Sequence, residues 1–264
     1  MCSSDLGIAR VVLVAVVAWL GLLLVVPLVA LAVTVARSLP DVAAQLSTRE
    51  ALHAMALSLA FAVVSIGINS AFGIAGGLVL VRQHFLGRRL LDAFVDLPLA
   101  LSPVMTGLAF LLVFGRTGVA RPVLERLGID VAFAWPAVLV ATLFVTLPFT
   151  LREVALVLAE IGDTEEQAAA TLGASAWQTF WRVTLPNVWG AVVGGATLTA
   201  ARALGEFGAV LVVGGAIANR TQTATTFIHG AIEERQEPAA YGMALLLAAA
   251  SVALLVALHR RKNA

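Results

Sequence analysis

Cysteine is almost absent from this chain. Cys2 is the only cysteine in 264 residues, so no disulfide can form within the chain and a disulfide-stabilised fold is excluded. The four histidines are scattered and lack the spacing of a metal site. The phosphate-binding pattern G-x-x-x-x-G-K-[ST] and the nucleophile pattern G-x-S-x-G do not occur. We therefore expect no enzyme activity, and no ATP, other cofactor or metal bound by this chain itself.

Charged side chains are also scarce. They make up 12% of the residues, against 60% hydrophobic residues, and the formal net charge is +1. This balance gives no attraction to nucleic acid, and no basic patch is interleaved with aromatic residues. It is typical of a protein surrounded by membrane lipid. The opening letters MCSSDL lack a cleavable signal pattern, and we expect an irregular tail there.

The apolar residues occur in long runs. A membrane-spanning helix needs about 20 of them, and six stretches meet or approach that length. They are roughly 10–36, 54–81, 93–114, 135–159, 187–215 and 240–258. Pro98 and Pro103 interrupt the third stretch, which we therefore expect to lie inside the bundle. The sequence predicts an all-α, polytopic membrane protein with about six transmembrane helices, forming a single domain over 1–264.

A polar segment separates the fourth and fifth apolar stretches. It reads DTEEQAAATLGASAWQTFWRVTLP and covers 163–186. Thr164 and Gln167 have the spacing of a capping box, which predicts the start of a helix. The alanines that follow favour helix, and Gly173 is placed to end it in a left-handed conformation.

A second short helix is expected after Gly173. Ser175 and Gln178 repeat the capping spacing, and Leu185-Pro186 is expected to stop the helix and begin the next. The pair of helices, over about 164–181, would form a compact knob suited to a partner. An amphipathic loop in the lipid headgroups is an equally open interpretation, for which Trp177 and Trp181 are suitable.

This polar segment resembles the EAA motif of ABC-importer permeases. That motif reads Glu-Ala-Ala, three residues, Gly, nine residues, Ile, one residue, Leu-Pro. The matching positions here are Gln167, Ala168, Ala169, Gly173, Val183, Leu185 and Pro186. Gln167 replaces the motif Glu, although Glu165 and Glu166 directly precede it. The resemblance implies coupling helices that dock, with Glu166 among their residues, into a groove on a cytoplasmic ATPase subunit.

The positive charges suggest which side of the membrane holds this segment. With both termini cytoplasmic, nine Lys and Arg residues lie on the inner side and seven on the outer side. The two densest clusters, at 82–89 and 260–262, are both on the inner side. An even number of spans then places 160–186 in the cytoplasm, where an ATPase partner would be.

Polar side chains inside the spans are costly and therefore informative. We expect the Asp96 carboxylate to cap a helix or to form a pair with another side chain near the inner membrane face. Arg202 and Glu206 are four residues apart on one helix face. They predict either an intrahelical ion pair facing the bundle or part of the translocation pathway or gate. Gly205 and Gly208 belong to a small-residue face that permits close approach of another helix, most simply from a second permease subunit.

Three further blocks, at 50–60, 96–115 and 201–223, resemble the sulfate/thiosulfate branch of the oxyanion importers. The string Gly205–Ala209 also occurs in molybdate and tungstate permeases, so it identifies the oxyanion group and not the anion. The resemblance implies a bacterial inner-membrane permease that works by alternating access. It also implies a related second permease, two ATPase subunits carrying ATP and Mg, and a periplasmic sulfate-binding protein. Loop 216–238 would meet that protein or be an ordinary solvated loop.

A different class stays open on the residues alone. An ATP-independent secondary anion transporter could use Asp96, Arg202 and Glu206 as a charge relay. Such folds usually show internal repeats, and none is evident here. Co-purification with a separate ATPase would distinguish the two classes.

Overall fold

The computed structural model describes residues 2–128 and 131–262, and all regular elements in these ranges are helices. The helices are α1 (Cys2–Arg37), α2 (Leu39–Leu46), α3 (Arg49–Arg82), α4 (Arg88–Ala100), α5 (Pro103–Phe114), α6 (Arg121–Arg126), α7 (Trp135–Ile161), α8 (Thr164–Thr171), α9 (Ala176–Thr179), the π-helical turn η1 (Phe180–Thr184), α10 (Leu185–Leu204), α11 (Gly208–Gly214), α12 (Ala224–Glu233) and α13 (Glu237–Lys262). The predicted all-α fold is confirmed.

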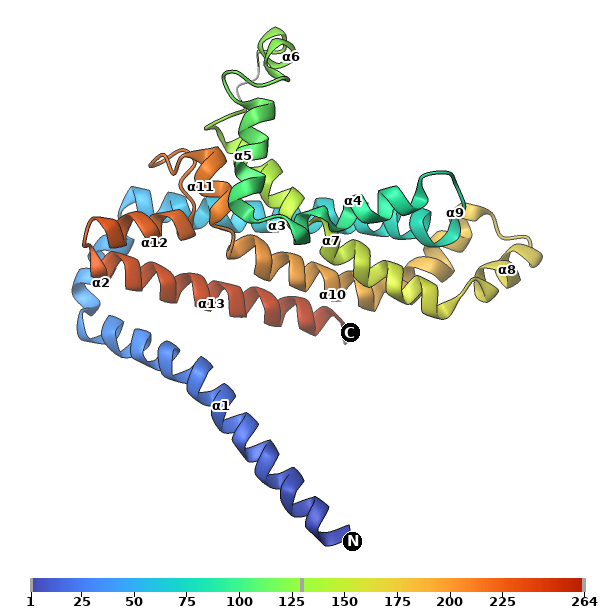
Figure 1. Cartoon of the computed structure of the whole chain (residues 1–264), viewed down its shortest axis with the longest axis horizontal. Helices are drawn as coiled ribbons and strands as arrows, with labels where there is room; N and C mark the ends of the chain where they lie inside the picture. The colour runs from blue at the N-terminus through green and yellow to red at the C-terminus, as the bar shows by residue number, and fades with distance from the viewer. Residues whose placement is uncertain (1, 129–130, 263–264) are drawn as a thin grey trace.

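Four long helices, α3, α7, α10 and α13, form the body of the molecule (Figure 1). The coupling insert, defined here as residues 163–184, extends from one end of this bundle. Helices α2 and α12 lie at the opposite end (Figure 1). The last turn of α13 and the first turn of α1 both point toward the side where the insert lies (Figure 1).

Helix α7 packs between α3 and α10 through small residues around Thr150. A Cβ added to Gly73 of α3 would lie 2.8 Å from Thr150 Cγ2, and one added to Gly195 of α10 would overlap the Thr150 Cα. The Thr150 and Thr199 hydroxyls are 3.4 Å apart. Small residues let membrane helices approach closely, and this approach supplies their packing energy.

A buried polar contact joins α3 and α7 farther from the insert. The Asn69 side chain of α3 donates to the Leu143 carbonyl at 3.1 Å and to Thr146 Oγ1 at 2.7 Å, both on α7. Asn69 and Thr146 are fully buried. Because neither side chain has water available, the hydrogen bonds fix the register of α3 against α7.

Four of the six predicted spans are single helices long and apolar enough to cross a membrane. They are Val12–Arg37, Arg49–Arg82, Trp135–Ile161 and Glu237–Arg260. The other two predicted spans are bent pairs, each with the composition of a span. The expectation of six helices therefore holds only if each pair counts as one broken span.

The predicted span 93–114 is not one helix, which corrects our expectation. Helices α4 and α5 meet at 114°, and α5 leaves the bundle to carry α6 at its tip (Figure 1). Pro103 explains the break, whereas Pro98 lies inside α4. Ser102 precedes Pro103 and has extended backbone with ψ 139°, because a residue before proline is disfavoured in the helical region.

The predicted span 187–215 is also broken. The helix that ends at Leu204 and the helix α11 meet at 56°. Between them the Glu206 carboxylate accepts a hydrogen bond from the Ala209 N–H at 3.0 Å, at the start of α11. A carboxylate at this position satisfies an otherwise unpaired amide and interacts favourably with the helix dipole. Glu206 thus begins a new helix instead of continuing α10.

The opening segment is helical rather than irregular, since α1 begins at Cys2. In a membrane this apolar run must pair its own backbone groups, which favours helix, and Pro27 lies within it. Most of the span Val12–Arg37 is exposed in the isolated chain, and α1 diverges from the bundle (Figure 1). In a membrane, this apolar surface must be covered by lipid or by another subunit.

The small-residue face of the fifth apolar stretch is used largely within the chain. Gly195 packs on α7, Gly208 on Pro103 and Val104 of α5, and Gly214 on Val138 of α7. This differs from our expectation that a second subunit would approach this face. Gly190 has no neighbour within 4 Å of an added Cβ.

The contrast between Gly195 and Gly190 predicts a stability difference. Gly195→Ala should lower the melting temperature of the purified protein, because its Cβ would overlap the backbone of Thr150 and overpacking costs about 1–3 kcal/mol. Gly190→Ala on the same helix should be neutral or slightly stabilising, because alanine favours helix. Equal melting temperatures for the two variants would contradict the close packing of α7 on α10.

Candidate functional site

The first helix of the coupling insert is α8. Its N-cap is Asp163 rather than Thr164, and no side chain caps it, so the Thr164–Gln167 capping box that the sequence predicts is wrong. The backbone explains this, because Gln167 N–H already donates to the Asp163 carbonyl at 2.9 Å. Thr164 is therefore the first helical residue.

The end of α8 is as expected. Gly173 has φ +84°, in the left-handed region. Its N–H donates to the Ala170 carbonyl, and the next N–H, of Ala174, donates to the Ala169 carbonyl, both at 3.0 Å. These two bonds form a Schellman motif, which satisfies the last carbonyls of the helix. Space is open around Gly173, so its backbone conformation is what calls for glycine.

The second helix of the insert, α9, begins with the predicted capping box. The Gln178 N–H donates to Ser175 Oγ at 3.3 Å, and the Ser175 N–H donates to Gln178 Oε1 at 2.9 Å. The expected stop at Leu185-Pro186 is wrong, because α9 continues through η1 into α10. Pro186 lies in the first turn of α10, where a missing N–H costs little.

The insert presents an apolar surface outward. Leu172 is 88% exposed and Trp177 is 68% exposed. Trp177 stacks on Phe180 and meets Trp181 edge to face, so the three rings form one cluster. Exposed aromatic residues of this kind are enriched at protein interfaces and in the lipid headgroup layer.

The residues matching the EAA motif divide by exposure. Gln167, Ala168 and Pro186 are exposed, whereas Ala169, Val183 and Leu185 are half-buried. The half-buried set attaches the insert to the bundle, and the exposed set is available to a partner.

Glu166 is held by contacts within the chain. Its Oε2 accepts from Arg82 Nε at 3.0 Å, and its Oε1 accepts from Thr184 Oγ1 at 2.8 Å. Arg82, the last residue of α3, also donates to the carbonyls of Leu158 at 3.0 Å and Gly162 at 2.5 Å. One guanidinium therefore joins α3, the end of α7 and α8.

Glu165 makes a second attachment. Its Oε2 accepts from Asn187 Nδ2 of α10 at 2.5 Å. Together with Thr184 of η1, the two carboxylates bind α8 to the helix that follows the insert. A displacement of the insert is thus transmitted to α3, α7 and α10 without a flexible connection.

The Asp96 carboxylate forms a two-pronged ion pair with Arg152 of α7. Arg152 donates from Nε to Asp96 Oδ1 at 2.8 Å and from Nη2 to Asp96 Oδ2 at 2.7 Å. Its Nη1 also donates to Asp92 Oδ1 at 2.6 Å. The arrangement holds α4 against α7, and both aspartates are half exposed.

Arg202 and Glu206 form the expected ion pair. Arg202 Nη1 lies 2.5 Å from Glu206 Oε2, as an ionic contact whose angle is not that of a hydrogen bond. The Glu206 side chain is 1% exposed and that of Arg202 is 31% exposed. Besides capping α11, Glu206 accepts a bond from Thr225 Oγ1 at its carbonyl, at 2.7 Å. Glu206 therefore links α10, α11 and the start of α12.

The charged residues proposed as a relay are in separate clusters. Asp96 pairs with Arg152 between α4 and α7, whereas Arg202 and Glu206 lie at the α10–α11 break. In the part of the chain that the structure describes, no ion pair joins the two clusters. Gly205 and Gly208 flank Glu206, and Gly208 brings α11 against α5.

Sequence reasoning missed the partners of the charged residues. Arg82 and Arg152 were evident only as positive charges near the inner ends of spans. One signal was available for Arg82. It ends a long apolar run, and carboxylates stand near the start of the insert. Nothing in the spacing, however, pairs residues 84 positions apart.

The fold and this insert define a multi-pass membrane protein with a polar attachment segment at one end. Residues 69–261, more than half of the chain, match the family described as "Binding-protein-dependent transport system inner membrane component". The chain belongs to this family.

Curated relatives are similar over most of their length. The chain is 43% identical to the "Sulfate transport system permease protein CysW" of Synechococcus elongatus, over 90% of this chain and 84% of that protein. It is 37% identical to the "Sulfate transport system permease protein CysT" of Escherichia coli K12, over 90% and 86%.

A solved structure has the same fold. A chain from the "Crystal structure of a bacterial ABC transporter involved in the import of the acidic polysaccharide alginate" matches with a TM-score of 0.80, over 97% of this chain and 95% of that one. At 16% identity, this likeness concerns the fold alone.

The Arg82–Glu166 contact predicts a measurable coupling between α3 and the insert. Arg82→Gln should lower the melting temperature more than Glu166→Gln, because Arg82 also loses two carbonyl partners. The double variant should lose about 1 kcal/mol less stability than the sum of the losses in the two single variants. Gln167→Ala, at an exposed neighbouring position, serves as the control with little effect. Additive single effects would contradict the contact.

The Arg202–Glu206 pair predicts a rescue. Arg202→Ala leaves a buried carboxylate without its counter-charge, which costs about 3–5 kcal/mol for a buried pair. Adding Glu206→Gln removes the charge but keeps an acceptor for Ala209, so the double variant should regain part of the lost melting temperature. A double variant as unstable as Arg202→Ala would show that the pair's charge is unimportant.

Proposed function

We propose that this chain is a permease subunit of an ATP-driven importer for sulfate or thiosulfate. The observation that carries the proposal is the 43% identity to a CysW protein over 90% of the chain. The rigid coupling insert supports it, because an ATP-independent carrier has no need of such a segment.

The complete importer would contain four kinds of component. The similarity to both CysW and CysT proteins favours pairing with a related but different permease. Two ATPase subunits would bind below, carrying the ATP and Mg. A periplasmic sulfate-binding protein would deliver the anion, as a periplasmic protein does for the alginate importer of similar fold. The setting would be the bacterial inner membrane, with both termini cytoplasmic and lipid covering the remaining apolar surface.

The proposed mechanism is alternating access. Closure of the ATPase dimer would move the insert by way of exposed residues such as Gln167, Ala168 and Leu172. Because Glu165 and Glu166 attach α8 to the spans, the motion would be transmitted as rigid-body rocking. ATP binding must favour the outward-facing state through differential binding energy, since a ligand that binds both states equally shifts neither.

The charged residues of the spans would act within this movement. Arg202 is partly exposed beside the buried Glu206, so it is available to a passing anion while Glu206 holds its position. Asp96 would hold α4 on α7. We assign Gly205 and Gly208 to the flexibility and close packing of the break between α10 and α11.

Radiolabelled sulfate uptake tests the proposal. Cells lacking this chain should regain uptake when it is restored together with its partners. Unlabelled molybdate as competitor distinguishes the anions, because restored uptake abolished by molybdate would indicate a molybdate or tungstate permease. Absence of restored uptake, with the chain present in the membrane, would contradict the proposal.

Gly173 gives a sharper test of coupling. Gly173→Pro should reduce sulfate uptake more than tenfold without reducing the amount of chain in the membrane, because proline cannot adopt a positive φ. Gly173→Asn should retain most uptake, since asparagine tolerates the left-handed region. A bulky residue at the half-buried Ala169 should act like Gly173→Pro. Normal uptake by the proline variant would refute the assignment of the insert to ATPase docking.

A further inference from the structure

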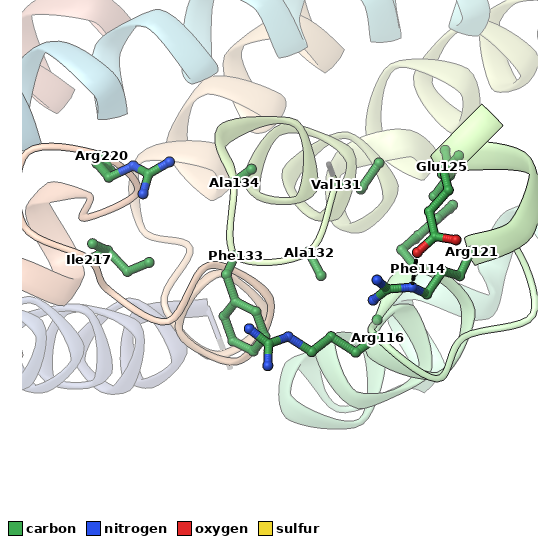
Figure 2. A pocket seen from close by; sticks show the side chains of 12 residues that line it. Phe114, Arg116, Arg121, Glu125, Val131, Ala132, Phe133, Ala134, Ile217 and Arg220 are labelled. Atoms are coloured by element: carbon green, nitrogen blue, oxygen red, sulfur yellow. Dashed lines mark hydrogen bonds and ion pairs between the residues drawn. The ribbon is translucent and has the colours of Figure 1, made fainter. Parts of the chain in front are cut away.

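A cavity of about 550 Å³ lies beside the start of α7, at the opposite end of that helix from the insert. It opens between the end of α5, helix α6, the segment 131–134 and the turn that follows α11 (Figure 2). The segment 131–134 directly precedes α7, whereas the insert follows the other end of that helix. The cavity and the insert are therefore on opposite sides of the membrane.

The charged side chains that line the cavity have a surplus of positive charge. They are Arg116, Arg121, Arg220 and Glu125. Arg121 Nε donates to Glu125 Oε1 at 2.6 Å, so this pair neutralises itself (Figure 2). Among the residues that the structure describes, Arg116 and Arg220 form no ion pair. Asp130 adjoins the segment 131–134 but lies outside the described residues.

The turn that carries Arg220 is held in place by buried hydrogen bonds. Thr221, which is 1% exposed, donates to the Gly214 carbonyl at 2.7 Å and accepts from the Ile217 N–H at 3.0 Å. The Arg220 N–H donates to the Ile217 carbonyl at 3.1 Å. The main chain at Arg220 is thus fixed before any ligand arrives.

The opposite wall is fixed to the end of α11, which leads into this turn. The Phe133 N–H donates to the Val213 carbonyl at 2.9 Å. Phe133 has φ +57° and Ala216, in the turn after α11, has φ +48°, a conformation that costs such residues about 1–3 kcal/mol and persists only where the surroundings enforce it. Strained backbone thus borders both sides of the cavity, as is common at binding sites.

We infer that this cavity is a collecting site for tetrahedral oxyanions, held by Arg116 and Arg220. The planar guanidinium group binds pairs of anionic oxygen atoms better than any other side chain. The cavity is larger than a bare sulfate ion, so the anion keeps part of its water, which makes its binding modest and its exchange rapid. A positively lined concavity also raises the local concentration of anions and their rate of arrival.

The inference rests on the proposed function for the identity of the anion and for the outer location. Arg116 and Arg220 would capture sulfate near the entrance and reduce its escape before the inward step. The phosphate of an anionic lipid headgroup presents the same oxygen atoms, and the experiment must separate these two sources.

The test is radiolabelled sulfate binding to the complete importer in phosphatidylcholine nanodiscs, at constant ionic strength and without nucleotide or delivery protein. Arg116→Gln and Arg220→Gln should each weaken binding about three- to fivefold, because each removes one exposed charged contact worth about 1 kcal/mol. Arg126→Gln, on α6 but outside the cavity lining, is the matched control and should leave the affinity unchanged.

Glu125→Gln gives a change of opposite sign. It removes a negative charge from the lining and releases Arg121, so sulfate affinity should rise about threefold. A folding defect cannot produce tighter binding, which protects the test against misfolded variants.

The outcomes separate the possibilities. Weaker binding in both arginine variants with tighter binding in Glu125→Gln supports the inference. If sulfate does not bind, but the arginine variants reduce retention of phosphatidylglycerol added to the nanodiscs, the oxyanion is the lipid phosphate. Unchanged sulfate and lipid binding in every variant overturns the inference.

Sulfate uptake by the same importer, reconstituted in sealed liposomes with ATP and the delivery protein, tests the proposed function separately. Cavity binding without sulfate uptake by the unmodified importer would contradict the proposed function and leave the collecting site intact. Normal uptake, with sulfate and lipid binding unchanged in the cavity variants, would support the proposed function and overturn the collecting site.

Discussion

The structure depends on how closely α7 can lie between α3 and α10. Gly73 and Gly195 leave no room for a side chain on either side of Thr150, so the three backbones touch. In a membrane, lipid is as apolar as the helix surface, so association relies on such contact and on a few polar links. Asn69 provides one of these links. With α7 fixed, its two ends position the insert on one side and the cavity wall on the other.

The charged residues also hold helices together. Three carboxylates join helices: Glu166 joins α3 to the insert, Asp96 joins α4 to α7, and Glu206 joins α10 to α11. Such residues are costly within or near a membrane unless they are paired. Here the pairing defines which elements move together. The side chains left exposed on the insert are mostly apolar or uncharged, as docking to another protein requires.

The sequence predicts the long helices well because lipid demands about 20 apolar residues in each. It also predicts Gly173 and the Ser175–Gln178 cap, since both depend on residues close in sequence. It fails at the two breaks. Pro103 was visible as an interruption, but the angle of 114° depends on how α5 packs against α11 through Gly107. Glu206 was expected as a pathway or pairing residue, and its capping of α11 follows only from the bend itself. Pairs such as Arg82 with Glu166 join distant positions, which no local pattern encodes.

The π-helical turn Phe180–Thr184 has a mechanical consequence. It joins α9 to α10 with no loop between them, whereas the other end of the insert departs from α7 at Gly162, which has φ +66°. One end of the insert therefore continues directly into α10, whereas the other joins α7 through a glycine turn whose carbonyl accepts from Arg82. A push on the aromatic cluster would be converted mainly into torque on α10, and through it on the bend at Gly205. A displacement of the insert outside the membrane would thus reach the middle of the membrane as a rotation of α10.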